Sequence, residues 1–211
     1  MAKSGRRSAA GSAETGARRE ALVEAAFQTL RDDGFARASA RAIAGRAGCN
    51  SALVFYYFDS VNELLVEALA RSSREQLQRY EEALADVTGI DELVTSVRRR
   101  LQDDMASGHV RVLVELMGAV SSDERLRSAV LAQVKPWMAL TERTIERILS
   151  PSGLGGLVPS NQAAFVVVAL FLGVELLADV AGADETIDGL FDSAQQLMRL
   201  LGAMLPTEPT T

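Results

Sequence analysis

Side chains that could contact a nucleic acid are concentrated in the first third of the chain. Ser51 can donate or accept a hydrogen bond at a base edge, and Ala52 is small enough to approach the methyl group of thymine. Tyr56 and Tyr57 carry hydroxyls that can reach phosphate oxygens, and a helix beginning at Ser60 would present free amides to an anion. These residue types predict a short segment that reads bases beside groups that hold the phosphate backbone.

Two short helices and a glycine turn would hold these side chains in position. Ser39 is a suitable N-cap for the first helix, and Gly48 breaks that helix. Asn50 is a second N-cap, so the next helix is predicted at Ser51–Tyr57. The sequence after Ser60 has the spacing of a capping box, which predicts the start of a third, longer helix. Helix, turn and short helix form the layout of a helix-turn-helix, whose second helix lies in the DNA major groove.

The stretch IAGRAGCNSALVFYYFDSVNELL, residues 43–65, resembles the signature of TetR-type transcriptional regulators. The resemblance covers roughly the first third of the chain, and the remainder is similar to the family only in length and helical pattern. It implies a helix-turn-helix head, a helical body that binds a ligand and dimerises, and an operator in double-stranded DNA. The matching positions are Ile43, Ala44, Ala47, Gly48, Asn50, Ala52, Tyr56, Phe58, Ser60, Leu64 and Leu65.

The resemblance also implies which residues contact DNA. Arg41 and Ser51 are expected to read bases, because residues at the position of Arg41 often reach into the groove in related proteins. Phosphates are expected at both tyrosines and at the start of the third helix. The complete predicted set is Arg37, Ser39, Ala40, Arg41, Asn50, Ser51, Ala52, Tyr56, Tyr57 and Ser60.

The chain departs from the family pattern at three positions that often hold phosphates. Leu53 replaces a threonine or serine, Phe55 replaces a tyrosine and Val61 replaces a lysine. All three residues are apolar here, so the phosphate contacts must come from other side chains. The expected substitutes are the N-terminal arginines together with Arg37, Arg41 and Arg46.

Charge is unevenly distributed along the chain. Residues 1–50 carry nine Lys or Arg and five Asp or Glu, a net charge of +4, whereas residues 51–211 carry thirteen and twenty-three, a net charge of −10. A basic head on an acidic body is typical of a DNA-binding domain joined to a sensor. The single Cys excludes an internal disulfide and suits a reducing cytoplasm. The longest apolar stretch is too short to span a bilayer, so we expect a cytoplasmic protein with no membrane partner.

Apolar residues at helical spacing predict an all-α chain of about nine helices. We expect a disordered basic tail at residues 1–16, a helix-turn-helix DNA-binding domain at residues 17–60, and a ligand-binding and dimerisation domain at residues 61–211. The body helices are predicted at about 60–85, 91–107, 109–120, 121–149, 161–180 and 186–205.

The first helix, predicted from about Ala17 to Asp33, has a recognisable C-terminal signal. Gly34 follows the expected C-cap, and Phe35 could pack back against Leu30. That combination predicts a Schellman ending, in which the residues after the helix donate to its last carbonyls.

The helix predicted at Asn161–Val180 is hydrophobic nearly all round, so a single chain cannot cover every face of it. We expect it to pair with the last helix, at about Thr186–Leu205, and with both copies from a partner. Such a four-helix interface would make a homodimer whose two heads fit a palindromic operator.

Polar and adaptable side chains interrupt the apolar faces of the body helices. Methionines let a cavity adapt to its guest, and an apolar pocket with a few polar anchors is the usual form of a small-molecule site. Pro136 should kink its helix and open space beside Trp137. We expect a mainly hydrophobic effector that releases the protein, a repressor, from its operator. The candidate residues are Met105, His109, Met117, Trp137, Phe171 and Glu175.

Two other classes of protein remain open. A helical interaction module with weakened DNA binding is favoured by the apolar Leu53, Phe55 and Val61. A small-molecule-binding enzyme would need a nucleophile with a base, paired carboxylates or metal ligands. The chain has one His and one Cys, and Glu175 with Asp179 is better explained as a solvated helix face. We therefore expect no catalytic residue, no metal site and no cofactor.

Overall fold

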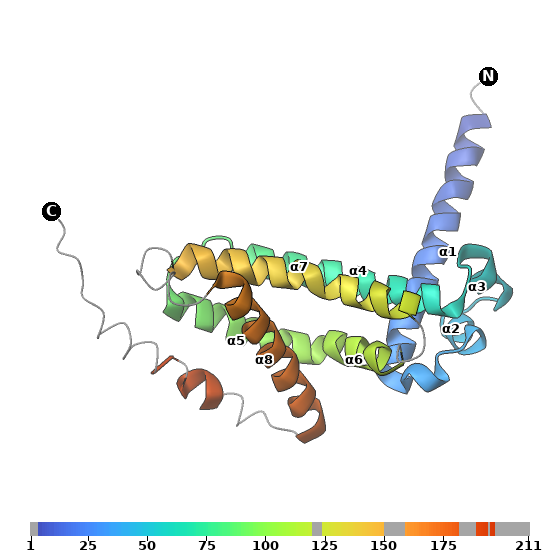
Figure 1. Cartoon of the computed structure of the whole chain (residues 1–211). Helices are drawn as coiled ribbons and strands as arrows, with labels where there is room; N and C mark the ends of the chain where they lie inside the picture. The colour runs from blue at the N-terminus through green and yellow to red at the C-terminus, as the bar shows by residue number, and fades with distance from the viewer. Residues whose placement is uncertain (1–3, 120–123, 150–158, 182–188, 194, 197–211) are drawn as a thin grey trace. The chain divides into compact units, whose positions relative to one another are not determined.

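The computed structural model describes residues 4–119, 124–149, 159–181, 189–193 and 195–196, and no strand occurs among them. The predicted all-α fold of about nine helices is confirmed (Figure 1). Residues 189–193 and 195–196 are helical and fall within the last helix predicted from the sequence. The preceding elements are α1 (Ser4–Asp33), the 3-10 helix η1 (Phe35–Arg37), α2 (Ala40–Arg46), α3 (Ala52–Tyr57), α4 (Val61–Leu84), α5 (Ile90–Ser107), α6 (His109–Ala119), α7 (Glu124–Leu149) and α8 (Ser160–Ala181).

The chain folds into two compact units. The first comprises Met1–Glu75 and Arg111–Val134, and the second comprises Gln76–Val110 and Lys135–Thr211. Three long elements, α4, α6 and α7, contribute residues to both units. The boundary predicted at residue 60 separates the helix-turn-helix from the remainder by its expected role, and it stays a prediction.

The first unit is built on the apolar stripe of α1. Leu22, Ala26 and Leu30 are fully buried, because their spacing places them on one side of the helix. Helix α2 packs against α1, and α3 packs against α2, as Figure 1 shows. Ile43 from α2 and Val54 from α3 are fully buried in this core. These helices are too short to be stable alone, and the burial of their apolar side chains holds them in place.

The start of α1 differs from the tail predicted for residues 1–16, because the helix already begins at Ser4. Extending an existing helix needs no new nucleus, and the early residues include good helix formers. An ion pair between Arg18 and Glu14, with a distance of 2.8 Å, supports this part of the helix at i, i+4 spacing.

The end of α1 also differs from the prediction. The Gly34 N–H donates to the Leu30 carbonyl at 3.1 Å, but the Phe35 N–H donates to Oε2 of Glu115 in α6 at 2.9 Å. A Schellman ending would turn the Phe35 N–H back to a carbonyl of α1 itself. The Schellman prediction is wrong because a carboxylate from a distant part of the chain supplies the acceptor.

Charged side chains of α4 tie it to α1 within the first unit. Arg71 forms ion pairs with Glu20 and Glu24 of α1, and it lies 3.6 Å from Glu75 one turn further along α4. The guanidinium of Arg19 lies 4.9 Å from the centre of the Phe58 ring, which is a cation–π contact at the end of α3. These contacts supplement the buried apolar surface that holds the head on α4.

In the second unit, α7 runs beside the end of α4. Arg147 donates to the Leu84 and Ala85 carbonyls at 2.5 and 3.1 Å, and Arg143 donates to Glu81 at 3.2 Å. The Arg147 guanidinium thus satisfies carbonyls that a helix end leaves without partners. Helix α7 continues through Pro136, and α5 packs against α8.

Candidate nucleic-acid interface

Helix α2 begins where the sequence predicts. The Ser39 hydroxyl accepts a hydrogen bond from the Ala42 N–H at 3.2 Å, and the extended backbone of Ser39 is typical of an N-cap. Ile43 and Ala44 are buried, whereas Arg41 and Ala42 are exposed. The predicted N-cap is confirmed, and the helix turns Arg41 toward solvent.

The turn after α2 is satisfied by its own backbone. The Cys49 N–H donates to the Ala44 carbonyl at 2.9 Å, and the Gly48 N–H donates to the Gly45 carbonyl at 3.2 Å. These are the two bonds of a Schellman motif. Gly48 has φ of 66°, and a Cβ there would meet no atom within 4 Å. Glycine is therefore required by backbone conformation and not by crowding.

Helix α3 starts at Ala52, one residue later than predicted. The Asn50 side chain accepts from the Ala52 N–H at 2.8 Å, so Asn50 caps the helix as the sequence indicates, although Ser51 intervenes with helical backbone angles. Val54 is fully buried, and this fixes which side of α3 faces the core.

The opposite side of α3 consists of small and aromatic residues. Ala52 is exposed, and the exposed fractions of the Phe55 and Tyr56 side chains are 62% and 73%. Tyr57 is half-buried, and its ring meets that of Tyr56 edge-on at 4.9 Å between centroids. Of the three departures from the family pattern, Phe55 is the exposed one, because Leu53 and Val61 are half-buried.

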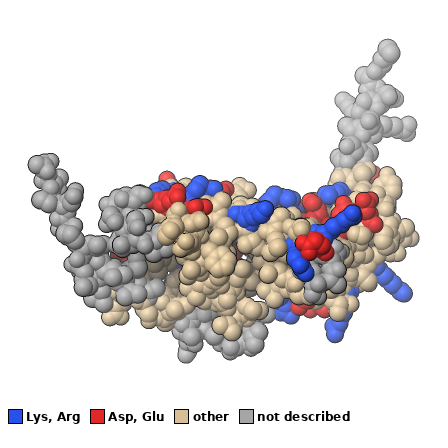
Figure 2. Space-filling view, in the orientation of Figure 1, with Lys and Arg blue, Asp and Glu red and all other residues tan. Residues whose placement is uncertain are grey.

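The arginines near this surface have different surroundings. Arg37 in η1 and Arg41 in α2 are exposed, and neither forms an ion pair within the described part of the chain. Figure 2 shows basic side chains extending into solvent around α2. Arg46 instead lies 2.6 Å from Asp32 and 2.9 Å from Asp33 at the end of α1. Hydrogen bonds from Arg31 and Arg46 hold the pKa of Asp32 below its usual value, so Arg46 ties α2 to α1.

The start of α4 is capped from both directions. Ser60 Oγ accepts from the Glu63 N–H at 3.1 Å, and Oε2 of Glu63 accepts from the Asp59 N–H at 2.6 Å. The capping box predicted from the sequence is present, but its carboxylate bonds one residue earlier than in the usual form. The exposed acids Asp59 and Glu63 place negative charge beside Ser60, which weakens the attraction of this helix start for a phosphate.

Several predicted effector residues come together in the second unit. The Tyr80 ring meets the Trp137 ring edge-on at 5.2 Å and the Phe171 ring at 6.0 Å, and the His109 ring lies 6.4 Å from that of Trp137. Met105 and Phe171 both pack against the buried Leu101. Tyr80 was not among the predicted effector residues, although a tyrosine among the apolar residues of a helix is itself a signal of a polar contact inside.

Two predicted effector residues stand apart from this group. Met117 belongs to the first unit, and its side chain is 42% exposed. Glu175 lies on α8, and its side chain is outside the described residues. The grouping therefore retains Met105, His109, Trp137 and Phe171, with Tyr80 added.

The same unit buries two ionisable side chains. Burial lowers the pKa of His109 to about 4, and Arg79 adds to that effect. Burial raises the pKa of Asp104 to about 6, against the opposing influence of the Tyr80 hydroxyl and Arg79. Asp104 was missed by the sequence analysis, yet it lies seven residues after Val97 and so shares the apolar face of α5.

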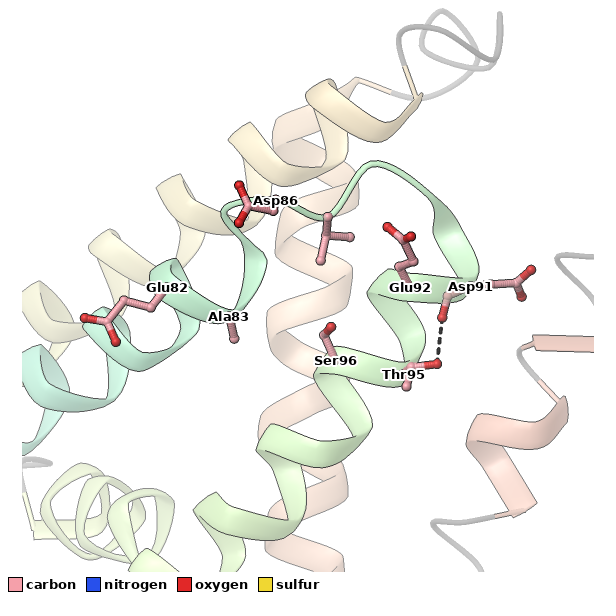
Figure 3. A pocket seen from close by; sticks show the side chains of 8 residues that line it. Glu82, Ala83, Asp86, Asp91, Glu92, Thr95 and Ser96 are labelled. Carbon is pink, nitrogen blue, oxygen red and sulfur yellow. Dashed lines mark hydrogen bonds between the residues drawn. The ribbon is translucent and has the colours of Figure 1, made fainter.

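A surface hollow of about 440 Å³ lies where α4 ends and α5 begins (Figure 3). Thr95 Oγ1 donates to the Asp91 carbonyl at 2.8 Å beside it. None of the predicted effector residues contributes to the hollow, and the described residues contain no group of three or more ligands suited to a metal ion. Its lining is Glu82, Ala83, Asp86, Val87, Asp91, Glu92, Thr95 and Ser96.

Comparison with known proteins identifies the head. The family model described as "Bacterial regulatory proteins, tetR family" matches residues 22–68, which contain the end of α1, α2, α3 and the start of α4. Residues 22–68 of this chain are a TetR-family DNA-binding domain. The match is confined to the elements whose caps and turn are described above, so the resemblance seen in the sequence is confirmed.

Curated relatives agree with this assignment. An uncharacterised HTH-type transcriptional regulator of Mycobacterium tuberculosis is 30% identical over 109 residues. The match takes in 52% of this chain and 56% of that protein, so the chain spans about half the length of this curated relative. None of the described helices of this chain has the length and apolar composition needed to cross a membrane.

Solved structures show that the fold extends over the body. A putative transcriptional regulator of Pseudomonas aeruginosa has a TM-score of 0.74 at 20% identity. The match covers 90% of this chain and 92% of that one. The transcriptional regulator FadR of Bacillus subtilis, solved in complex with stearoyl-CoA, has a TM-score of 0.71 at 14% identity, and the match covers 84% of this chain and 96% of that one. At these identities the likeness shows that the fold is shared and nothing more.

Proposed function

We propose that this TetR-family protein is a transcriptional regulator that binds double-stranded operator DNA as a homodimer and acts as a repressor. The observation that carries the proposal is the capped helix-turn-helix, in which α3 buries Val54 and leaves Ala52, Phe55 and Tyr56 exposed. A short helix that is held in place by its neighbours and exposes its outer side chains to solvent is suited to enter a major groove.

Arg41 and Ser51 read bases in this proposal, while Tyr56 and Tyr57 hold phosphates. The exposed Arg41 supports its role because no acid within the described residues neutralises its guanidinium. The remaining predicted contacts lie in η1, at the start of α2, in the turn before α3, in α3 and at the start of α4. They are Arg37, Ser39, Ala40, Asn50, Ala52 and Ser60.

The test begins with selection of bound sites from random duplex DNA, followed by titration of the selected duplex. Arg41→Ala should weaken binding by about 1 to 3 kcal/mol if its contact to guanine is bidentate. Tyr57→Phe should weaken all sequences alike. Arg99→Ala is the matched control, because it removes one exposed cation from α5 without touching the head. Equal losses for Arg41→Ala and Arg99→Ala would contradict base reading by Arg41.

Dimerisation through α8 and the last predicted helix is the second part of the proposal. Phe165, Leu170 and Leu177 on α8 have exposed fractions of 65%, 57% and 64%. A single exposed apolar residue is ordinary, but several on one helix indicate a surface that a partner covers. The partner we propose is a second copy, since two heads are needed for a palindromic operator.

Leu170→Glu should split the dimer and abolish operator binding, because the new carboxylate would have to be buried without a partner. Leu131→Glu is the control, since Leu131 is also exposed but lies on α7 in the first unit. Sedimentation of the wild-type chain as a stable monomer at micromolar concentration would contradict the dimer.

The effector is the third part of the proposal. We infer that a small, mainly hydrophobic molecule binds beside Tyr80, Trp137 and Phe171 and favours a state whose heads are wrongly spaced for DNA. The aromatic grouping supports an apolar ligand, and the buried Asp104 and His109 offer polar anchors. The relative that holds stearoyl-CoA shares only the fold, so the class of effector rests on the residues of this chain. Such a ligand can shift the equilibrium only by its difference in affinity between the two states.

Trp137 is the single tryptophan of the chain and supplies the test. Apolar small molecules that change its fluorescence should also lower operator affinity. The Trp137→Phe variant should lose the fluorescence change while its operator is still released. Compounds that alter the fluorescence and never alter operator affinity would contradict the coupling between the two sites.

The two rival classes receive less support. The interaction module was favoured by three apolar residues, but two of them, Leu53 and Val61, are half-buried and contribute to packing. No described grouping has the geometry of a nucleophile with its base, so nothing observed favours an enzyme. Retention on nonspecific duplex that falls as salt rises would separate a DNA-binding protein from an interaction module.

A further inference from the structure

The outer face of α3 carries no charged or amide side chain available for reading bases. Ser51 precedes Phe55 by four residues and Ala52 precedes it by three, so the three share one side of the helix. Asn50, the nearby amide, uses its Oδ1 to accept from the Ala52 N–H. Guanine and adenine are usually read by long side chains with paired hydrogen-bonding groups. This face therefore lacks the paired groups that discriminate guanine or adenine, and Ser51 can add only a single hydrogen bond.

A thymine methyl group is the base feature that does suit this face. It projects into the major groove and is recognised by apolar contact with residues such as Ala and Phe. The Phe55 ring is 62% exposed at the centre of the face, and Ala52 is small enough to let the helix approach the base edge. Tyr56, which follows Phe55 in the sequence and whose ring meets that of Tyr57 edge-on at 4.9 Å, carries an exposed hydroxyl that can bond to the phosphate backbone.

We propose that Phe55 is a specificity-determining residue that selects thymine by packing its ring on the C5-methyl group in each operator half-site. This inference rests on the proposed function, because it requires that α3 enters the major groove. It also explains why an apolar ring occupies a position where a hydroxyl would bind phosphate: the residue reads a base instead. Purine reading is then left to Arg41, which projects from α2 rather than from α3.

The experiment uses the selected operator and the full-length chain. Each thymine of a half-site is replaced in turn by deoxyuridine, which removes the methyl group and keeps the base pair. At one thymine per half-site the substitution should weaken binding about fourfold, the ratio that corresponds to one buried methyl group. In Phe55→Ala the same substitution should change nothing, because the ring that contacts the methyl group is gone.

Two further variants separate this role from a structural one. Phe55→Leu keeps an apolar side chain and should retain part of the preference for thymine over deoxyuridine. Tyr56→Phe should weaken every duplex equally and leave that preference unchanged. Since Phe55 is largely exposed, the thermal unfolding midpoint of Phe55→Ala should match that of the wild-type chain.

The outcomes distinguish the inference from the function on which it rests. A wild-type chain that binds no selected duplex would contradict the proposed function itself. Binding that is insensitive to deoxyuridine at every thymine would overturn the role of Phe55 and leave DNA binding intact. A preference for thymine that persists in Phe55→Ala would overturn it equally.

Discussion

The turns at Gly34 and Gly48 both require a glycine with positive φ, yet they are completed in different ways. Gly48, with φ of 66°, is followed by backbone bonds that return to α2 itself. Gly34 has φ of 79° and ψ of 170°, and the next N–H donates to the Glu115 carboxylate, eighty residues further along the chain. One turn is closed by its own neighbours, and the other needs a second helix to be in place.

This difference indicates how each turn responds to change. The Gly48 turn should form whenever α2 forms, because all of its acceptors lie within five residues. The Gly34 turn depends on α6, whose first residues belong to the second unit and whose Glu115 belongs to the first. A shift of α6 would therefore remove the acceptor from Phe35 and alter how α1 ends, while the helix-turn-helix itself would keep its bonds.

The largest expected effect comes from Gly34→Ala. The backbone at Gly34 lies in a region that other residues occupy at a cost of about 1 to 3 kcal/mol. A Cβ there would also lie 3.2 Å from Oε2 of Glu115, so the total loss in unfolding free energy should approach about 3 kcal/mol. Urea unfolding measures it, and in a Glu115→Ala background the steric part should disappear. A loss equal to that of Gly48→Ala would remove the distinction between the turns.

Two buried ionisable groups, His109 and Asp104, also depend on the fold of the second unit. The pKa of His109 is lowered to about 4 in the folded state. The stability that neutral His109 contributes to the folded state is therefore fully present above pH 6.5 and is lost as the pH falls toward 4. The pKa of Asp104 is raised to about 6 in the folded state. The stability that protonated Asp104 contributes to the folded state is therefore fully present below pH 3.8 and is lost as the pH rises toward 6. Between pH 4 and 6 the two act in opposite directions.

Asp104→Asn removes the pH dependence of stability that Asp104 causes, so the pH dependence caused by His109 should become visible. Its unfolding free energy, relative to the wild-type chain, should fall by about 2 kcal/mol between pH 6 and pH 4.5. Urea unfolding at both pH values provides the measurement, and Asp103→Asn, which changes an exposed neighbour, is the control. If the pH dependence of Asp104→Asn matched that of the wild-type chain, Asp104 would not be protonated in the folded state.

Gly48→Ala should cost about 1 to 2 kcal/mol, the usual penalty for a left-handed conformation with a Cβ. No steric term is expected, because nothing lies within 4 Å of the added atom. Gly48→Asn should cost less, since asparagine tolerates this conformation better than alanine does. Thermal unfolding compares the two variants, and an asparagine variant less stable than the alanine variant would mean that crowding governs the site.

The smallest expected effect is that of Ser39→Ala, about 1 kcal/mol, because it removes one local cap from α2. Ser39→Asp should restore most of the lost stability, since an aspartate can accept the same hydrogen bond. The free energies of unfolding from urea titrations of both variants test this assignment. Identical losses for the two variants would show that the cap contributes little.

Local sequence determined the elements of the head. Ser39, Gly48 and Asn50 each act within five residues of their position, so their types alone predict the caps and the turn. The apolar stripes likewise predict which faces of α1 and α4 are buried, because helical spacing needs no knowledge of the partner. The sequence alone therefore predicts the helix-turn-helix and its exposed residues.

Tertiary structure decided the features in which distant residues meet. The Phe35 N–H could not be assigned to Glu115 from the sequence, and neither could Arg46 to the acids at the end of α1. Asp104 was an unremarked acid on a helix until the fold buried it near Tyr80. In each case the physical reason is the same: hydrogen bonds and desolvation depend on which groups are brought together, and spacing along the chain carries that information only for neighbours.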